Sequence, residues 1–173
     1  MPEPAPSPQH PGGSPTSSDY EQVYLAEYDR IVRTVYLVVR DAGRAEDLAQ
    51  EAFVRLYLQW GKVGRYERPG AWVRRVAIRL ATREAHRERV RSLLERKARA
   101  PVMANEPDAD LMHVVSALPL RQRAAVVLFY YEDLPVAEVA DTLAMSESAV
   151  KVTLHRARHA IAARLGEEAS DVR

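Results

Sequence analysis

A pair of short amphipathic helices joined by a tight turn, predicted over Leu134–Leu165, limits the fold of this chain more than any other pattern in it. Apolar residues recur there at three- and four-residue steps, which is the spacing of one helix face. The second helix is expected to begin after Ser146, whose hydroxyl oxygen can cap an unpaired backbone N–H. Together the two helices form a helix-turn-helix pattern, whose second helix has the width and polarity to enter a DNA major groove.

The outward face near the start of that second helix is polar and largely basic. Five apolar residues are expected to pack inward, namely Val150, Leu154, Ala157, Ile161 and Leu165. The face that remains is the one that contacts bases in this motif, and it consists of Ser146, Glu147, Ser148, Lys151, Val152, His155, Arg156 and Arg158. A plain helical hairpin is the alternative, but the basic leading face favours DNA binding.

A second basic helix is predicted upstream, from Ala71 into the nineties. It carries an arginine every four residues, at Arg75, Arg79, Arg83 and Arg87, so the four share one broad face away from the apolar stripe. A guanidinium can bind a phosphate through two parallel hydrogen bonds. The alternative is a solvated face with Glu84 and Glu88 as local partners. Residues 62–99 hold 13 Lys or Arg against four Glu, so these acids cannot neutralise the row, which favours nucleic-acid contact.

A glycine-containing loop, residues 61–70, precedes that helix and adds Lys62, Arg65, Tyr66 and Arg68. Trp60 and Trp72 flank the loop. Basic side chains beside aromatic rings suit a splayed single strand, because bases stack on the rings while cations bind the backbone. The alternative is that both tryptophans belong to the core, and Trp72 is in phase with the apolar stripe.

A helix predicted over residues 45–60 carries Asp47, Gln50 and Glu51 on the side away from its apolar stripe, and Val54 and Leu58 continue that side. An exposed face that mixes acids with aliphatic residues suggests a docking surface, and its charge favours a protein with basic side chains over DNA. The alternative is a set of acids favoured by the helix macrodipole beside incidental exposed aliphatics. The spacing does not decide between them.

The helical periodicity extends over almost the whole chain, so the predicted fold is all-α, with two small helical domains joined by a flexible linker. Residues 1–18 hold six of the 11 prolines and are expected to form a disordered tail. The first domain is expected over residues 19–91, the linker over 92–109, the second domain over 110–166 and a short tail over 167–173. Within these domains, helices are expected near residues 20–40, 45–60, 71–91, 109–117, 120–131, 136–144 and 147–165.

Composition narrows the class of protein further. The chain has no cysteine and no apolar run of membrane-spanning length, which favours a soluble cytoplasmic protein without membrane insertion. No nucleophile–base pair, metal-ligand cluster or phosphate-binding glycine loop is evident, so an enzyme is the least expected class of protein.

Four stretches of the chain resemble a known family. They are AEDLAQEAFVRLY (45–57), PGAWVRRVAIRLA (69–81), ALPLRQRAAVVLFYYEDL (117–134) and SAVKVTLHRARHAI (148–161). In order and spacing they are similar to extracytoplasmic-function sigma factors of bacterial RNA polymerase. Their sequence is most similar to the actinobacterial SigE-type branch. Residues 19–91 resemble the sigma-2 domain of that family and residues 110–166 its sigma-4 domain.

The resemblance implies a protein that gives core RNA polymerase its promoter specificity and that has no catalysis, metal, cofactor or small-molecule substrate of its own. It implies that Asp47, Gln50, Glu51 and Arg55 contact the clamp helices of the beta-prime subunit, and that sigma-4 lies on the flap of the beta subunit. The −10 element would contact Lys62, Arg65, Trp72, Arg75, Arg79, Arg83 and Arg87, and the −35 element the second helix of the helix-turn-helix. Sigma factors of this type are commonly held by an anti-sigma factor, a further expected partner. Val152 and Thr153 depart from the usual pattern, so no promoter sequence can be transferred.

Two other functions stay open on the residues alone. A stand-alone helix-turn-helix regulator would act as a dimer on palindromic half-sites. A sigma-like decoy would sequester polymerase or an anti-sigma factor without supporting transcription. The presence of two separate basic helices and an acidic face favours the sigma factor.

Overall fold

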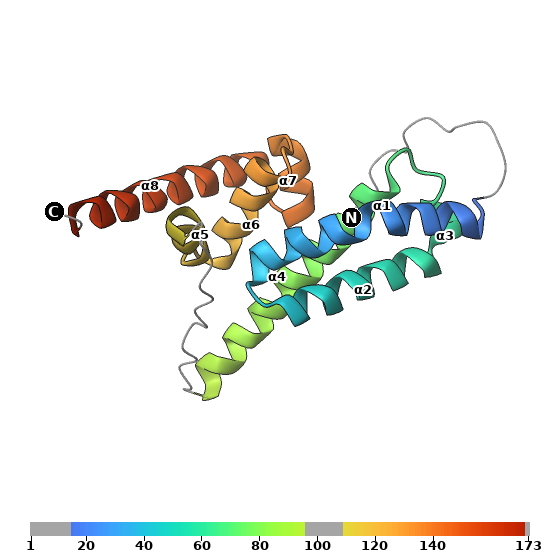
Figure 1. Cartoon of the computed structure of the whole chain (residues 1–173), viewed down its shortest axis with the longest axis horizontal. Coiled ribbons are helices and arrows are strands. Elements are labelled where there is room, and N and C mark those ends of the chain that lie inside the picture. The colour runs from blue at the N-terminus through green and yellow to red at the C-terminus, as the bar shows by residue number, and fades with distance from the viewer. Residues whose placement is uncertain (1–14, 96–108, 172–173) are drawn as a thin grey trace.

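The computed structural model describes residues 15–95 and 109–171, and every regular element within these ranges is helical, which confirms the all-α prediction. The elements are α1 (Ser17–Val39), α2 (Ala42–Leu58), α3 (Trp60–Val63), α4 (Pro69–Glu95), α5 (Ala109–Ser116), α6 (Leu120–Val126), the π-helical turn η1 (Val127–Tyr131), α7 (Val136–Leu143) and α8 (Glu147–Asp171). Figure 1 shows them as two groups, with α1 to α4 in blue to green and α5 to α8 in yellow to red.

Hydrogen bonds at the helix ends explain where α1 and α2 begin. Thr16 and Asp19 form a reciprocal capping box at the start of α1, and the hydrogen bonds from Thr16 hold the pKa of the Asp19 carboxyl below its usual range. α1 therefore begins at Ser17, two residues inside the segment expected to be a tail. Asp41 accepts a hydrogen bond from the Arg44 backbone N–H at 2.9 Å, so α2 begins at Ala42, three residues before the start expected near residue 45.

The first core lies between α1, α2 and α4, which pack against one another. Its largest fully buried side chains include Ile31, Phe53, Leu56 and Ile78, one or more from each of the three helices. Trp60 is also buried, and its indole N–H donates to the Thr16 carbonyl at 2.8 Å. For Trp60 the core alternative is therefore correct, whereas Trp72 is only partly buried against the core.

A close approach of the backbone fixes the glycine loop to the start of α1. A Cβ atom added at Gly64 would lie 2.7 Å from the Pro15 Cβ and 2.8 Å from the Trp60 carbonyl oxygen. Only a glycine fits at that distance without displacing backbone. The basic loop is thus anchored on the same helix end that Thr16 caps.

We call α1 to α4 the first bundle and α5 to α8 the second bundle. In the second bundle, α7 and α8 form the predicted helix-turn-helix. Ala144 takes a left-handed conformation with φ of 53°, and the Ser146 hydroxyl accepts the Ala149 backbone N–H at 3.2 Å, as predicted for an N-cap. The π-helical turn η1 ends the helix predicted over residues 120–131. Leu165 is exposed rather than packed inward, because α8 continues to Asp171, beyond the helices that cover its first turns.

The boundary predictions for the linker differ from the structure at both ends. α4 extends to Glu95 and α5 begins at Ala109, so residues 92–95 and 109 are helical rather than linker. The rest of the expected linker, like residues 1–14 of the tail, lies outside the described residues. The expected tail at 167–173 is helical as far as Asp171.

The two bundles pack against each other, which the sequence did not predict. α4 contacts α6 and α7, and α1 contacts α6 and η1 (Figure 1). Arg123 of α6 contributes to this packing, since its guanidinium donates to the Val38 carbonyl at 2.6 Å and also to the Ser116 carbonyl. Burial, together with the nearby Arg40 charge, lowers the pKa of Arg123.

Candidate nucleic-acid interface

The predicted base-contacting face of α8 lies on the surface. Val150, Leu154 and Ala157 are buried against the rest of the second bundle, as expected, and Ile161 is partly buried. The opposite face is exposed over all eight of its predicted residues, Ser146, Glu147, Ser148, Lys151, Val152, His155, Arg156 and Arg158. Val152 is 49% exposed among these polar side chains. The face offers cations for phosphates and one aliphatic side chain for a thymine methyl group.

The arginine row of α4 is divided into two parts. Arg83 and Arg87 are exposed, as the outward-facing prediction required. Arg75 and Arg79 instead contact α7: the Arg75 Nη2 atom lies 2.5 Å from Asp141 Oδ2, and Arg79 donates from Nη2 to the Asp141 carbonyl at 2.6 Å. Arg79 Nε also donates to the Thr142 carbonyl at 3.2 Å. The prediction that all four arginines point freely to solvent is therefore wrong for Arg75 and Arg79.

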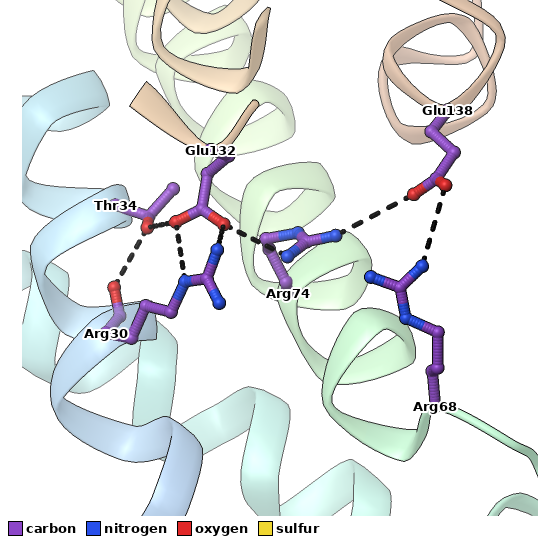
Figure 2. Close-up of polar contacts among 6 residues, drawn as sticks. All are labelled: Arg30, Thr34, Arg68, Arg74, Glu132 and Glu138. Atoms are coloured by element: carbon purple, nitrogen blue, oxygen red, sulfur yellow. Dashed lines mark hydrogen bonds and ion pairs between the residues drawn. The ribbon is translucent and has the colours of Figure 1, made fainter. Parts of the chain in front are cut away.

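Arg74, which no pattern in the sequence indicated, is the most buried arginine of α4 among the residues described. Its Nη1 atom lies 3.0 Å from Oε2 of Glu132, whose side chain is completely buried. Figure 2 shows the same carboxylate facing Arg30 and Thr34 of α1. Arg30 Nη2 lies 2.9 Å from Oε2, and the Thr34 hydroxyl donates a hydrogen bond of 2.5 Å to Oε1. No periodicity could reveal this cluster, because its members are separated by up to 102 residues.

Glu138 of α7 extends the same contact toward the basic loop. It lies 3.9 Å from Arg74 Nη2 and 3.8 Å from Arg68 Nη1, so Arg74 is placed between two carboxylates (Figure 2). Part of the predicted loop is helical, since α3 includes Lys62. The side chains of Lys62, Arg65 and Tyr66 are exposed. The loop therefore presents cations and a ring at the surface, while its Arg68 side chain approaches the second bundle.

The predicted docking face on α2 is exposed. Asp47, Gln50, Glu51 and Arg55 all lie on the surface, and Arg55 pairs with Glu51 at 2.6 Å between Nη2 and Oε1. Val54, Tyr57 and Leu58 are 57%, 61% and 76% exposed on the same helix. Val54 and Leu58 were expected on this face from the sequence, whereas Tyr57 was not. The resulting surface combines acids with an apolar patch, a combination suited to a protein partner.

The part of the chain that the structure describes shows neither a candidate metal site nor a helix that could span a membrane. Residues 15–95 and 109–171 contain no group of three or more His, Asp or Glu placed to bind a metal ion. Within the same ranges no helix has both the length and the hydropathy needed to cross a bilayer.

The chain matches two family models, one over each group of helices. Residues 23–92 match sigma-70 region 2 and residues 108–166 match sigma-70 region 4. The chain is 34% identical over 155 residues to an RNA polymerase sigma-E factor of Streptomyces coelicolor, covering 87% of this chain and 85% of that protein. A sigma-E factor of Streptomyces avermitilis is 34% identical over the same length, covering 87% and 84%.

A solved structure supports the fold. The sigma factor RpoE from Bartonella quintana, crystallised in complex with the anti-sigma factor NepR, superimposes with a TM-score of 0.67 at 19% identity, covering 86% of this chain and 98% of that one. The chain thus belongs to the sigma-70 family, and within it to the extracytoplasmic-function sigma factors of the SigE type. It is an RNA polymerase sigma factor, and it directs promoter-specific transcription initiation.

Proposed function

We propose that α8 contacts the −35 element through the exposed face that begins at Ser146. The observation that supports this assignment is the position of the face at the leading end of the second helix of a helix-turn-helix, the end that enters the major groove. Lys151, Arg156 and Arg158 supply positive charge for phosphates, and Val152 supplies an apolar contact. Contacts with the bases of the −35 element are therefore assigned to this face of α8.

The −10 element is assigned to α4 and the loop before it. Arg83 and Arg87 are exposed on successive helical turns, separated by about 6 Å of rise. Lys62 and Arg65 add charge on the loop, and Trp72 lies at its base. We further assign Arg75 and Arg79 to this surface, on the condition that α7 moves away from them when the protein works on a promoter.

Core polymerase is assigned to the α2 face. Asp47, Gln50, Glu51 and Arg55 would contact the beta-prime clamp helices, with Val54, Tyr57 and Leu58 providing apolar area. The second bundle would lie on the beta-subunit flap. This surface adjoins the basic one, because Glu51 and Arg55 line the same pocket as Arg83 and Arg87.

The remaining assignments concern partners and setting. The protein would act in the cytoplasm with the polymerase, without catalysis of its own and without a cofactor. An anti-sigma factor is a further expected partner, since the Bartonella relative was crystallised with one.

Two variants test this division of roles: one should lose binding to polymerase and the other binding to DNA. Asp47→Ala/Glu51→Ala should reduce co-purification with core polymerase while leaving α8 able to bind duplex DNA. Lys151→Ala/Arg156→Ala should do the reverse. Glu21→Ala/Glu46→Ala, which removes two negative charges at other exposed positions, is the control for the first variant and should change neither property. If both test variants lose the same property, the division of roles is wrong.

A further inference from the structure

A pocket of about 400 Å³ lies between α2 and the middle of α4, and all the residues that line it belong to these two helices. Its apolar wall consists of Leu48, which is buried, and Leu80, which is partly buried. The rest of the lining is charged, and four arginines outnumber two glutamates. The volume is within the range of small-molecule sites, and the charge favours an anion.

Two of the four arginines are paired with the two acids. Arg44 of α2 pairs with Glu84 of α4, and Arg55 pairs with Glu51 at 2.6 Å on α2. The side chains of Arg44 and Arg55 are 43% and 47% exposed, and ion pairs this exposed are weak. A guanidinium also has five N–H donors, so a pairing with one carboxylate leaves donors for a ligand.

The other two arginines supply the positive charge that remains. Arg83 and Arg87 are exposed on successive turns of α4, and none of the acids whose side chains the structure describes pairs with either of them. Each guanidinium can bind one phosphate group through two parallel hydrogen bonds. Two long side chains that line one pocket therefore suit a ligand with two adjacent phosphate groups.

We propose that this pocket binds a small molecule with two adjacent phosphate groups, of the class of a nucleoside diphosphate. The phosphates contact Arg83 and Arg87, with Arg44 at the side, and the remainder of the molecule packs against Leu48 and Leu80. Because Arg83 and Arg87 are also assigned to the −10 element, an occupied pocket reduces DNA binding. This second statement rests on the proposed function, whereas binding of the ligand does not.

The ion pair between Arg44 and Glu84 provides a matched pair of variants, since neither residue belongs to the surfaces assigned to DNA or polymerase. Arg44→Gln and Glu84→Gln break the same ion pair but change the charge of the pocket in opposite directions. Affinity for the ligand should fall about fivefold in the first and rise about fivefold in the second, the effect of one unit charge about 4 Å away in water. A merely structural role would move both in the same direction.

Titration calorimetry on the full chain measures this binding, with ADP, pyrophosphate and AMP as probes and without divalent cations. ADP should bind about tenfold more tightly than AMP, the effect of one further charge-assisted hydrogen bond. Pyrophosphate should bind more weakly than ADP, because it has no group for the leucines. Arg33→Gln and Glu21→Gln, at exposed positions of α1, control for net charge and should match wild type. No binding of ADP, equal affinity for ADP and AMP, or a shift of the same sign in both pocket variants would overturn the site.

Competition with DNA separates the site from the proposed function. The second probe is a single-stranded oligonucleotide of random sequence, since phosphate contacts do not depend on sequence. ADP should weaken oligonucleotide binding by wild type, and the same concentration should weaken it less in Arg44→Gln. If ADP binds without this effect, the competition is wrong and the site stands. If Arg83→Ala/Arg87→Ala loses ADP but keeps the oligonucleotide, the −10 assignment of these arginines is wrong, and the reverse result would overturn the site alone.

Discussion

Arg74 of α4 and Glu132 after η1 form an ion pair of 3.0 Å, and both side chains are shielded from water, at 9% and 0% exposure. The pair joins the two bundles through charged groups that are 58 residues apart in sequence. A buried carboxylate needs its partners, because an isolated charge in the interior is strongly unfavourable. The position of sigma-4 against sigma-2 therefore depends on a few long side chains as well as on apolar packing.

Glu132→Ala should destabilise the folded protein. It leaves Arg74 buried without its carboxylate partner, and the cost should be about 3 kcal/mol, at the low end for a broken buried pair because Arg30 can turn toward water. Urea denaturation measures the loss of free energy of unfolding. Glu132→Gln keeps an acceptor for Thr34 and should lose less. An unfolding midpoint equal to wild type in Glu132→Ala would contradict the importance of the cluster.

Gly64→Ala should destabilise the first bundle by about 1–3 kcal/mol, because its Cβ would overlap backbone and ring atoms that cannot move independently. Gly61→Ala is the matched control, since nothing lies within 4 Å of a Cβ at that position. Thermal unfolding followed by circular dichroism compares the two. Equal melting temperatures would show that the loop is not anchored on Pro15 and Trp60 as the structure has it.

Arg83→Ala and Arg87→Ala should each weaken promoter binding by the holoenzyme and reduce the slope of log affinity against log salt by about 1. The reason is the loss of one phosphate contact per variant. Neither should alter the unfolding midpoint, because both side chains are exposed. Arg33→Ala, an exposed arginine on α1, is the control for charge alone. A salt slope unchanged in both α4 variants would remove these residues from the DNA surface.

Val152→Ala should relax the sequence preference at one position of the −35 element. A mismatched base pair commonly costs about 1–3 kcal/mol, and the variant should lose most of that discrimination at the contacted position. Val152→Thr keeps a methyl group there and should preserve the preference. Selection of bound sequences from a randomised −35 region measures it. If Val152→Ala selects the same sequences as wild type, the side chain does not contact a base.

The helices and their exposed faces could be predicted because local chemistry determines them. Periodicity located α1, α2, α4 and the helix-turn-helix, and Ser146 indicated where α8 begins. The partners of Arg74, Arg75 and Arg79 could not be predicted, since their acids come from another bundle and no local pattern connects them. Trp60 was ambiguous for a related reason: only the contact with Thr16, 44 residues away, places it in the core.

The division of the arginine row has the same physical origin. Four arginines at equal spacing are equivalent in the sequence, but Asp141 lies against Arg75 and Arg79 and leaves Arg83 and Arg87 exposed. Only the packing of the two bundles makes them different. Leu165 illustrates the converse, because an apolar residue in phase with a buried stripe stays exposed where the neighbouring helices end.

Transcription by core polymerase reconstituted with this protein tests the sigma-factor function without further assumptions. Core polymerase, fragmented genomic DNA and purified protein are combined, and the 5′ ends of the transcripts are sequenced. We expect start sites that share one pair of upstream elements and that disappear when the protein is omitted or when α8 carries Lys151→Ala/Arg156→Ala. Transcripts that start at the same places without the protein, or that share no upstream elements, would contradict a role in promoter recognition.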